Sequence, residues 1–411
     1  MNYLSVQDLG KSYGIQTLFK GLNFGIDQGQ KVALVARNGT GKTTILRALA
    51  DVEPADTGLI VFRKDLRIAF LQQESDFGDA TTVFGAIYES DNPLLAAIKE
   101  YEAAMLNPEN ADTFQRAFDK MDQLQAWDYE VKVKTILSKL KLDELKQDIA
   151  LLSGGQRKRL ALAKILIEQP DFLILDEPTN HLDLGMIEWL QEYLTKENVT
   201  LFMVTHDRYF LDAICNEILE LEEGDLYRYK GNYTYYLEKK QERQSIMQTN
   251  IDKAKNIYSK ELEWMRRQPK ARGTKSKARI DSFYDVEKSA KKRIKNEKVQ
   301  LEIQMTRLGS KILELHKVSK AYGDLNILDQ FTYTFKKRDR IGIVGKNGVG
   351  KTTVLNMLTG SESIDAGKIV IGDTVVIGYY TQSGMKMDEG KRVIEIIRDI
   401  AEYIPLAGGR K

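Results

Sequence analysis

An apolar strand runs into a glycine-rich loop in the stretch Val32-Ala33-Leu34-Val35-Ala36-Arg37-Asn38-Gly39-Thr40-Gly41-Lys42-Thr43-Thr44. The next residues, Ile45-Leu46-Arg47-Ala48-Leu49, have the apolar spacing of a helix. A strand, a glycine-rich turn and a helix in this order are typical of a phosphate-binding loop, whose backbone N–H groups face the anion. We therefore expect Lys42 to reach the β- and γ-phosphates of a nucleotide and the hydroxyl of Thr43 to bind Mg²⁺.

The same pattern recurs 309 residues later in the chain. The apolar run Ile341-Gly342-Ile343-Val344 predicts a second strand, and Val354-Leu355-Asn356-Met357-Leu358 predicts the helix. Between them lies a second loop, Gly345-Lys346-Asn347-Gly348-Val349-Gly350-Lys351-Thr352-Thr353. We expect Lys351 and Thr352 to repeat the roles of Lys42 and Thr43.

Two further residue pairs share this register. Tyr13 and Tyr322 each lie 29 residues before the loop lysine, and Gln73 and Gln382 each lie 31 residues after it. Landmarks in one register indicate a tandem duplication. The first loop departs from the pattern because Ala36 stands where the second has glycine. An alanine fits there only with a negative φ or little strain, so the sequence leaves open whether Ala36 weakens nucleotide affinity at the first site.

Bulk composition fits an ordinary water-soluble protein of two or three domains: 411 residues, 42% hydrophobic and 29% charged. No apolar run approaches the roughly 18 residues of a membrane span, and the N-terminus shows no signal peptide. The single cysteine, Cys215, excludes an intrachain disulfide and predicts a reducing, cytoplasmic location. Its expected role is that of a small buried hydrophobic residue.

Charge is distributed unevenly along the chain. Residues 239–300 contain 19 Lys and Arg against 8 Asp and Glu, although the whole chain carries a net charge of only +2. This stretch contains one proline, Pro269, and we predict two charged helices with a break near Gln268–Gly273. A basic segment of this kind favours an acidic partner, although a solvated helix face is the alternative. A second helical segment, at about residues 82–142, interrupts the first half.

Downstream segments of the first half carry polar residues suited to ATP hydrolysis. The segment Leu152-Ser153-Gly154-Gly155-Gln156 precedes a helical pattern, which places Ser and Gly N–H groups at a helix N-terminus. The strand Phe172–Leu175 ends in Asp176 and Glu177. A strand-end aspartate beside a phosphate loop is suited to hold Mg²⁺, and the adjacent glutamate can orient and deprotonate a water.

A further strand, Leu201-Phe202-Met203-Val204-Thr205, leads into His206. A histidine at such a position is often structural, but in this series of motifs we favour contact with the γ-phosphate. The sequence shows neither a Cys/His metal cluster nor a Gly-x-Ser-x-Gly elbow, so metal-centre and nucleophile chemistry have no support.

Together these residues resemble the ATP-binding-cassette ATPases of the ABC-F branch. The segment 152–156 is similar to the signature motif, and Asp176-Glu177-Pro178-Thr179-Asn180-His181-Leu182-Asp183 is similar to the Walker B and D-loop segment. The linker sequence Glu261-Leu262-Glu263-Trp264-Met265-Arg266-Arg267 is similar to that of Uup-like members. The resemblance implies an α/β fold: a first P-loop cassette at 1–238, a helical-hairpin linker at 239–310 and the N-terminal part of a second cassette at 311–411.

The resemblance also implies roles for the remaining residues. Tyr13 and Tyr322 would stack on adenine, and Gln73 and Gln382 would sense Mg²⁺ and water. Residues Ser153 to Gln156 would bind the γ-phosphate of a nucleotide held by the opposite cassette. The cofactors implied are ATP and Mg²⁺, with Glu177 and His206 as the catalytic residues.

The second half of the duplication is incomplete in this sequence. At the spacing of the first half, its signature serine would fall near residue 462, beyond Lys411. We therefore interpret the second cassette as truncated, with Leu406-Ala407-Gly408-Gly409-Arg410-Lys411 matching a signature in letters only. Neither composite site is complete within the chain, which predicts weak ATP turnover. Pairing of two first cassettes between molecules would make turnover rise with protein concentration.

Three functions are compatible with these observations. The first is an ATP-driven factor that binds the ribosome through its basic linker, because phosphate contacts need only cations. The second is a Uup-like DNA-binding ATPase, which the linker charge does not exclude. The third is the ATP-binding subunit of a membrane transporter, which the long basic linker disfavours. Within the linker, Tyr258 and Trp264 could stack on bases, but packing between its two helices is the favoured alternative.

Overall fold

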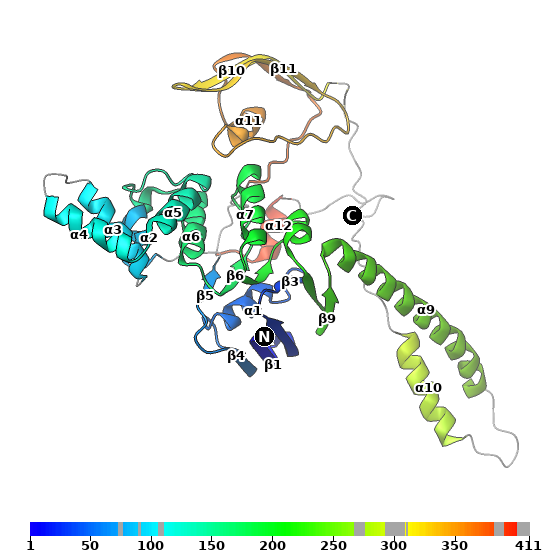
Figure 1. Cartoon of the computed structure of the whole chain (residues 1–411). Coiled ribbons are helices and arrows are strands. Elements are labelled where there is room, and N and C mark those ends of the chain that lie inside the picture. Colours follow the sequence, from blue (N-terminus) through cyan, green and yellow to red (C-terminus); the bar gives the residue numbers. More distant parts are fainter. Residues whose placement is uncertain are drawn as a thin grey trace, which may run out of the picture. The chain divides into compact units, whose positions relative to one another are not determined.

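The computed structural model describes residues 1–72, 77–88, 92–105, 111–266, 276–291, 309, 311–381 and 390–400 (Figure 1). The chain divides into two compact units, Met1–Ile294 and Lys295–Lys411. Each unit has its own sheets and helices, and each is described separately below.

A six-stranded sheet of order β5-β6-β7-β3-β8-β9 forms the centre of the first unit. Its strands are β3 (Lys31–Ala36), β5 (Ile68–Leu71), β6 (Phe172–Asp176), β7 (Thr200–Val204), β8 (Glu217–Glu222) and β9 (Asp225–Lys230). All neighbours pair in parallel except β8 and β9. Every residue of β6 and β7 is buried, as expected for central parallel strands covered on both faces. Their parallel direction brings the ends of β3, β6 and β7 to one edge of the sheet.

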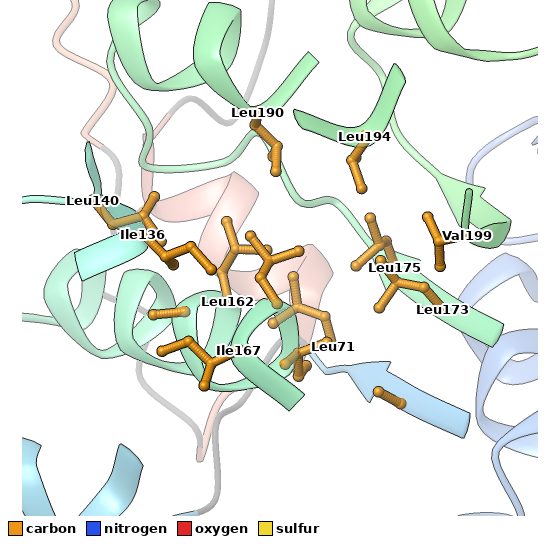
Figure 2. Close-up of a cluster of buried hydrophobic side chains, with 14 of the residues drawn as sticks. Leu71, Ile136, Leu140, Leu162, Ile167, Leu173, Leu175, Leu190, Leu194 and Val199 are labelled. Atoms are coloured by element: carbon orange, nitrogen blue, oxygen red, sulfur yellow. The ribbon is translucent and has the colours of Figure 1, made fainter. Parts of the chain in front are cut away.

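Two apolar layers cover the faces of this sheet. One is formed by α1 (Lys42–Leu49) and an antiparallel sheet of order β2-β1-β4, whose strands are β1 (Asn2–Tyr13), β2 (Gln16–Asp27) and β4 (Thr57–Phe62). The other is formed by helices α6 (Gly154–Glu168), α7 (Leu184–Lys196) and α8 (Arg208–Ile214). Figure 2 shows Leu162 of α6 and Leu190 of α7 meeting Leu173 and Leu175 of β6 in this second layer.

The segment at 82–142 contains the helices α2 (Val83–Tyr88), α3 (Pro93–Met105), α4 (Ala111–Gln123) and α5 (Trp127–Lys139). A short 3-10 turn at Ile149–Leu151 then leads to α6. Ile136 and Leu140 lie against Leu162 and Ile167 of α6 (Figure 2). The inserted helices therefore share the hydrophobic core of the cassette.

Two helices follow β9 and pack against each other: α9 (Tyr233–Arg266) and α10 (Lys277–Ala290). We call this pair the arm; Figure 1 shows it as two neighbouring helices in green and yellow-green. The break predicted near Gln268–Gly273 lies outside the described residues.

The second unit repeats the antiparallel layer of the first. Its sheet has the order β11-β10-β12, with β10 (Leu313–Tyr322), β11 (Leu325–Phe335) and β12 (Ala366–Ile371), which matches β2-β1-β4. The described residues of this unit also contain α11 (Lys351–Leu358) and α12 (Val393–Ile400). The match extends to backbone detail, because Asp8 and its equivalent Lys317 both have positive φ, at 53° and 47°.

The predicted strand Ile341–Val344 is wrong. These residues form no strand, and Ile341 and Val344 are 48% and 85% exposed. In the first unit the corresponding strand, β3, is hydrogen-bonded to β7 and β8. No strand of the second unit, within its described residues, offers this segment such partners. A strand forms only where neighbouring backbone groups can satisfy its own, so apolar sequence alone was insufficient.

Candidate nucleotide site and arm

The first phosphate loop leaves β3 at Ala36 and enters α1 at Lys42. Gly39 and Gly41 have φ values of 78° and 89°, a left-handed conformation that favours glycine. The Nζ atom of Lys42 donates to the carbonyl oxygens of Ala36 at 2.9 Å and Arg37 at 3.3 Å. The lysine therefore folds over its own loop, where its ammonium group is held at the centre of the backbone curl.

Ala36 carries no backbone strain in this loop. It is the last residue of β3 and is absent from the residues with positive φ. In the second loop a Cβ added to Gly345, its equivalent, would lie 3.1 Å from Cγ2 of Val349. The first loop has Thr40 in place of that valine, and its hydroxyl donates to the carbonyl of Arg37 at 2.8 Å. The condition under which an alanine fits this position is thus met.

Asp176 and Thr43 provide the test of whether Mg²⁺ fits the site. Asp176 is only 3% exposed, and neither of its carboxylate oxygens has a hydrogen-bond partner among the described residues. Burial raises the pKa of Asp176, and the nearby hydroxyl of Thr43 opposes this shift without forming a well-aligned hydrogen bond. A buried carboxylate with two free oxygens beside a hydroxyl fits a hard cation. In its described part the structure holds no group of three or more His, Cys, Asp or Glu side chains for a metal, so Mg²⁺ here would need ligands beyond such side chains.

Glu177 lies at the end of β6 with a left-handed backbone, φ 51°, and is 9% exposed. Its Oε2 atom accepts from the hydroxyl of Thr205 at 3.3 Å and from the backbone N–H of His206 at 3.2 Å. The Nε2 atom of His206 is 3.6 Å from Oε1 of Glu177, and the imidazole is largely exposed. Non-glycine residues keep such a backbone only where the surroundings hold it. The carboxylate is therefore oriented by the end of the neighbouring strand, β7.

Charge links these strand ends to the phosphate loop. Burial lowers the pKa of Lys42, and the carboxylates of Glu177 and Asp176 partly offset this shift. The structure thus brings together the predicted residues Lys42, Thr43, Asp176, Glu177 and His206 at one edge of the sheet. Thr205 was not predicted. Its position directly before His206, at the end of a buried strand, was the available signal.

Ser153 to Gln156 start α6. The hydroxyl of Ser153 accepts from the N–H of Gln156 at 3.3 Å, and the Gln156 side chain accepts from the N–H of Ser153 at 2.9 Å. This reciprocal capping box fixes the first turn of the helix. Ser153 and Gly154 are exposed, whereas Gly155 lies close to His181. The N-terminus of α6 is therefore ordered and accessible, as the predicted phosphate contact requires.

Tyr13 and Tyr322 keep their equivalence in the structure. The hydroxyl of Tyr13 donates to Glu53 at 2.5 Å, and Lys11 pairs with Glu53 at 3.3 Å. In the second unit Lys320 pairs with Glu362 at 3.0 Å, and Glu362 also interacts with Tyr322. Both tyrosine rings are about half exposed, at 51% and 47%. The Lys and Glu positions share the 309-residue register, a signal the sequence analysis missed.

The second loop has the same internal geometry as the first. Gly348 and Gly350 have φ values of 85° and 96°, and Lys351 Nζ donates to the carbonyls of Gly345 at 2.8 Å and Lys346 at 2.7 Å. The predicted ligands Gln73 and Gln382 lie outside the described residues, as does the terminal segment 406–411.

The arm is held together by aromatic and ionic contacts between its helices. Tyr258 stacks on Phe283 with ring centroids 5.4 Å apart. Arg279 binds Glu261 through two hydrogen bonds of 2.9 Å and lies 4.1 Å from the ring of Trp264. The packing alternative for Tyr258 and Trp264 is therefore confirmed. Several arm cations make no ion pair within the described residues: Lys253, Lys260, Arg266, Lys277 and Lys288.

Comparison with known proteins gives matches along the whole chain. A family model described as ABC transporter matches residues 19–180 and 328–395, and a second with the same description matches 219–302. The chain is 32% identical over 407 residues to the energy-dependent translational throttle protein EttA of Mycobacterium tuberculosis, strain H37Rv, and covers 73% of it. EttA is an ABC-F protein. The chain belongs to the ABC-F family of ATP-binding-cassette ATPases.

Other ABC relatives cover similar parts of the chain. The uncharacterized ABC transporter ATP-binding protein YfmR of Bacillus subtilis is 41% identical over the full length of this chain, which spans 66% of it. EttA of Escherichia coli K12 is 35% identical over 92% of this chain and 70% of its own length. A solved ATP-binding subunit of an ABC transporter aligns with 56% of this chain at 20% identity and a TM-score of 0.43.

This ABC-F chain therefore spans about two thirds to three quarters of the length of these curated relatives. In the part that the structure describes, none of its helices is both long and apolar enough to cross a bilayer.

Proposed function

We propose that the first cassette binds and hydrolyses Mg²⁺-ATP, and that the nucleotide state controls contact between the arm and ribosomal RNA. The observation that carries this proposal is the joining of two features within one unit. A buried, unpartnered carboxylate faces a phosphate loop, and the same sheet continues into a 34-residue helix with exposed cations. Relatives named for energy-dependent control of translation support the choice of partner.

In this proposal Glu177 is the general base. Its carboxylate is held by Thr205 and the backbone of His206, which directs it toward a water at the γ-phosphate. Lys42 neutralises the phosphates, and His206 contacts the γ-phosphate from the neighbouring strand end. Asp176 and Thr43 would hold Mg²⁺, which when bound neutralises charge on the β- and γ-phosphates.

The remaining predicted residues would complete nucleotide binding. Tyr13 and Tyr322 would stack on adenine, and Gln73 and Gln382 would sense Mg²⁺ and water. The accessible N-terminus of α6, at Ser153 to Gln156, would contact a nucleotide held by another cassette. That cassette is either the one containing Lys351 or the first cassette of a second molecule. A cytoplasmic location follows from a ribosomal partner and belongs to the same proposal.

The arm would bind RNA through its phosphates. Cations without an ion pair can contact phosphate without first breaking a protein contact, and each such contact makes affinity fall with salt. This recognition depends on charge and shape and needs no base sequence. The packed positions of Tyr258 and Trp264 leave base stacking to other residues.

Ribosome sedimentation with the Glu177→Gln chain tests the proposal. We expect ATP to increase the bound fraction, and salt to reduce it. In a second variant three unpaired arm cations are replaced by glutamine: Lys260, Arg266 and Lys277. The slope of log affinity against log salt should then fall by about 2–3, at roughly 0.7–0.9 per lost contact.

The matched control replaces three exposed lysines of the cassette, Lys20, Lys64 and Lys146, and should keep the original slope. Binding that ignores both ATP and the arm substitutions contradicts the proposal. Preference for branched DNA over ribosomes in the same assay would favour the DNA-binding alternative.

A further inference from the structure

A buried carboxylate that nucleotide chemistry does not use joins the arm to the central sheet. Glu220 lies in the middle of β8 and is 2% exposed. An ionised side chain at such a position is costly unless donors surround it. The donors that contact this carboxylate therefore indicate which elements it holds together.

Four donors from two elements reach the Glu220 carboxylate. Tyr229 of β9 donates at 3.1 Å, Tyr236 of α9 at 2.9 Å and Arg243 of α9 at 2.8 Å, and Lys240 of α9 also forms an ion pair with it. The three α9 residues are spaced four and three residues apart, so they lie on one face of the helix. The first three turns of the arm are thus bound to a single acceptor.

Arg243 extends this cluster across the strand pair. It also pairs with Glu222 of β8, and its guanidinium lies 3.6 Å from the ring centroid of Tyr227 of β9. Two cations and two carboxylates balance in charge. The ion pairs further along α9, such as Lys255 with Asp252, lie at the surface. Such pairs are screened by water and contribute little to stability. The base of the arm is therefore its one anchored part among the residues described.

The strand that carries Glu220 lies beside the strand that carries the phosphate loop. Glu220 pairs in register with Val35 of β3, and Leu221 pairs with Ala36, the first residue of the loop. Beyond the cluster α9 runs to residue 266; its 34 residues make a helix about 50 Å long. A rotation of about 10° at its base would move its far end by roughly 9 Å. A small rotation at the contacts of Glu220 would thus become a large displacement at the far end of the arm.

We propose that Glu220 is a positioning residue that makes the arm and the nucleotide-binding sheet a single rigid body. Tyr236, Lys240 and Arg243 are its partners on the helix. The rigid connection follows from the contacts alone. Its use, to deliver a nucleotide-driven movement of the cassette to the far end of the arm, rests on the proposed function.

Spin-label distance measurements on the full chain test this connection without any ribosome. Labels are attached at Glu188→Cys on α7 and Lys260→Cys on α9, both exposed positions, in a Cys215→Ala background. We expect a narrow distance distribution for the parent chain. Glu220→Gln should broaden it at least twofold, because the amide cannot hold both cations. Affinity for a fluorescent ATP analogue should change by less than about twofold, since Glu220 does not face the phosphate loop.

Glu242→Gln is the matched control. Glu242 is also on α9 but pairs with Lys239 at the surface, so its loss should leave the width unchanged. An unchanged width in a folded Glu220→Gln chain overturns the proposal. Should that variant fail to fold, Tyr236→Phe and Lys240→Met each remove one donor, and unchanged widths in both would overturn it equally. A broadened distribution for Glu220→Gln, combined with absent ribosome binding by the unlabelled parent chain, would retain the anchor and reject only the ribosomal partner.

Discussion

Replacing Asp176 with asparagine should stabilise the protein in the absence of metal and remove most of its stabilisation by Mg²⁺-ATP. The carboxylate is buried without a hydrogen-bond partner, and burial raises its pKa. For an acid with a raised folded-state pKa, the stability it contributes is present below the unfolded pKa. That contribution is lost as the pH rises through the folded value. Ionisation of Asp176 is therefore a cost that a bound cation would remove.

The size of the effect follows from the contacts of Asp176. A buried unsatisfied polar group costs about 1–3 kcal/mol, and more when charged. Asparagine leaves a polar group unsatisfied but removes its charge, so we expect a gain of about 1 kcal/mol and a rise of about 2–4 °C in Tm. Mg²⁺-ATP at about 100 times its Kd should stabilise the parent chain by about 2.7 kcal/mol. The variant should lose most of that gain.

Thermal unfolding at neutral pH, with EDTA and with Mg²⁺-ATP, measures both effects. Asp171→Asn is the control, because Asp171 precedes the same strand at its opposite end and pairs with Arg67 at 3.3 Å. Burial acts against this aspartate, but hydrogen bonds and charge from Arg67 hold its pKa below the usual range. The control should lower Tm slightly and keep the full response to Mg²⁺-ATP. A lower Tm for Asp176→Asn in EDTA, together with a full Mg²⁺-ATP response, would refute the metal site.

Three other substitutions test separate parts of the site. Glu177→Gln should reduce ATP turnover by about 10²–10⁴-fold while ATP affinity is retained, and turnover equal to the parent chain would remove Glu177 from its role as base. Thr205→Val removes a donor to the Glu177 carboxylate and should lower turnover by roughly tenfold at unchanged ATP affinity; a loss of affinity instead would indicate a merely structural role. Ala36→Gly should cost about 0.5–1 kcal/mol in unfolding free energy and leave ATP affinity unimproved, because Ala36 is unstrained. Improved ATP affinity of Ala36→Gly would contradict an unstrained Ala36. Gly345→Ala should lower the unfolding midpoint through contact of the new Cβ with Val349, and a raised midpoint would contradict that contact.

Local sequence patterns identify part of the fold and of the candidate site. The strand before Ala36 and the helix after Lys42 were predicted because apolar spacing and glycine placement act within a few residues. Asp176 and Glu177 were predicted because a continuous apolar strand directly precedes them. The failure at Ile341–Val344 has the opposite cause, since a parallel strand depends on hydrogen bonds from segments distant in the chain.

The contacts of Glu220 could not be predicted from local sequence patterns either. The segment Glu217-Ile218-Leu219-Glu220-Leu221-Glu222 reads as a strand with one polar face. Nothing in it indicates that Glu220 is buried or that its donors are 9 to 23 residues away. The role of Glu220 is visible only in the folded structure, where donors from α9 contact its carboxylate.

The two phosphate loops show which features of the site depend on nearby sequence and which depend on distant strands. Lys42 and Lys351 fold onto equivalent carbonyl oxygens, and the glycines of both loops have matching left-handed conformations. Only the first loop is preceded by a paired strand. The loop conformation therefore depends on its own glycines and lysine. The carboxylates of Asp176 and Glu177 depend on β6, which pairs in parallel with β5 and β7, segments that are distant from it in the chain. The conformation of a phosphate loop and the placement of the strand-end carboxylates thus have different structural requirements, and a segment can meet the first without meeting the second.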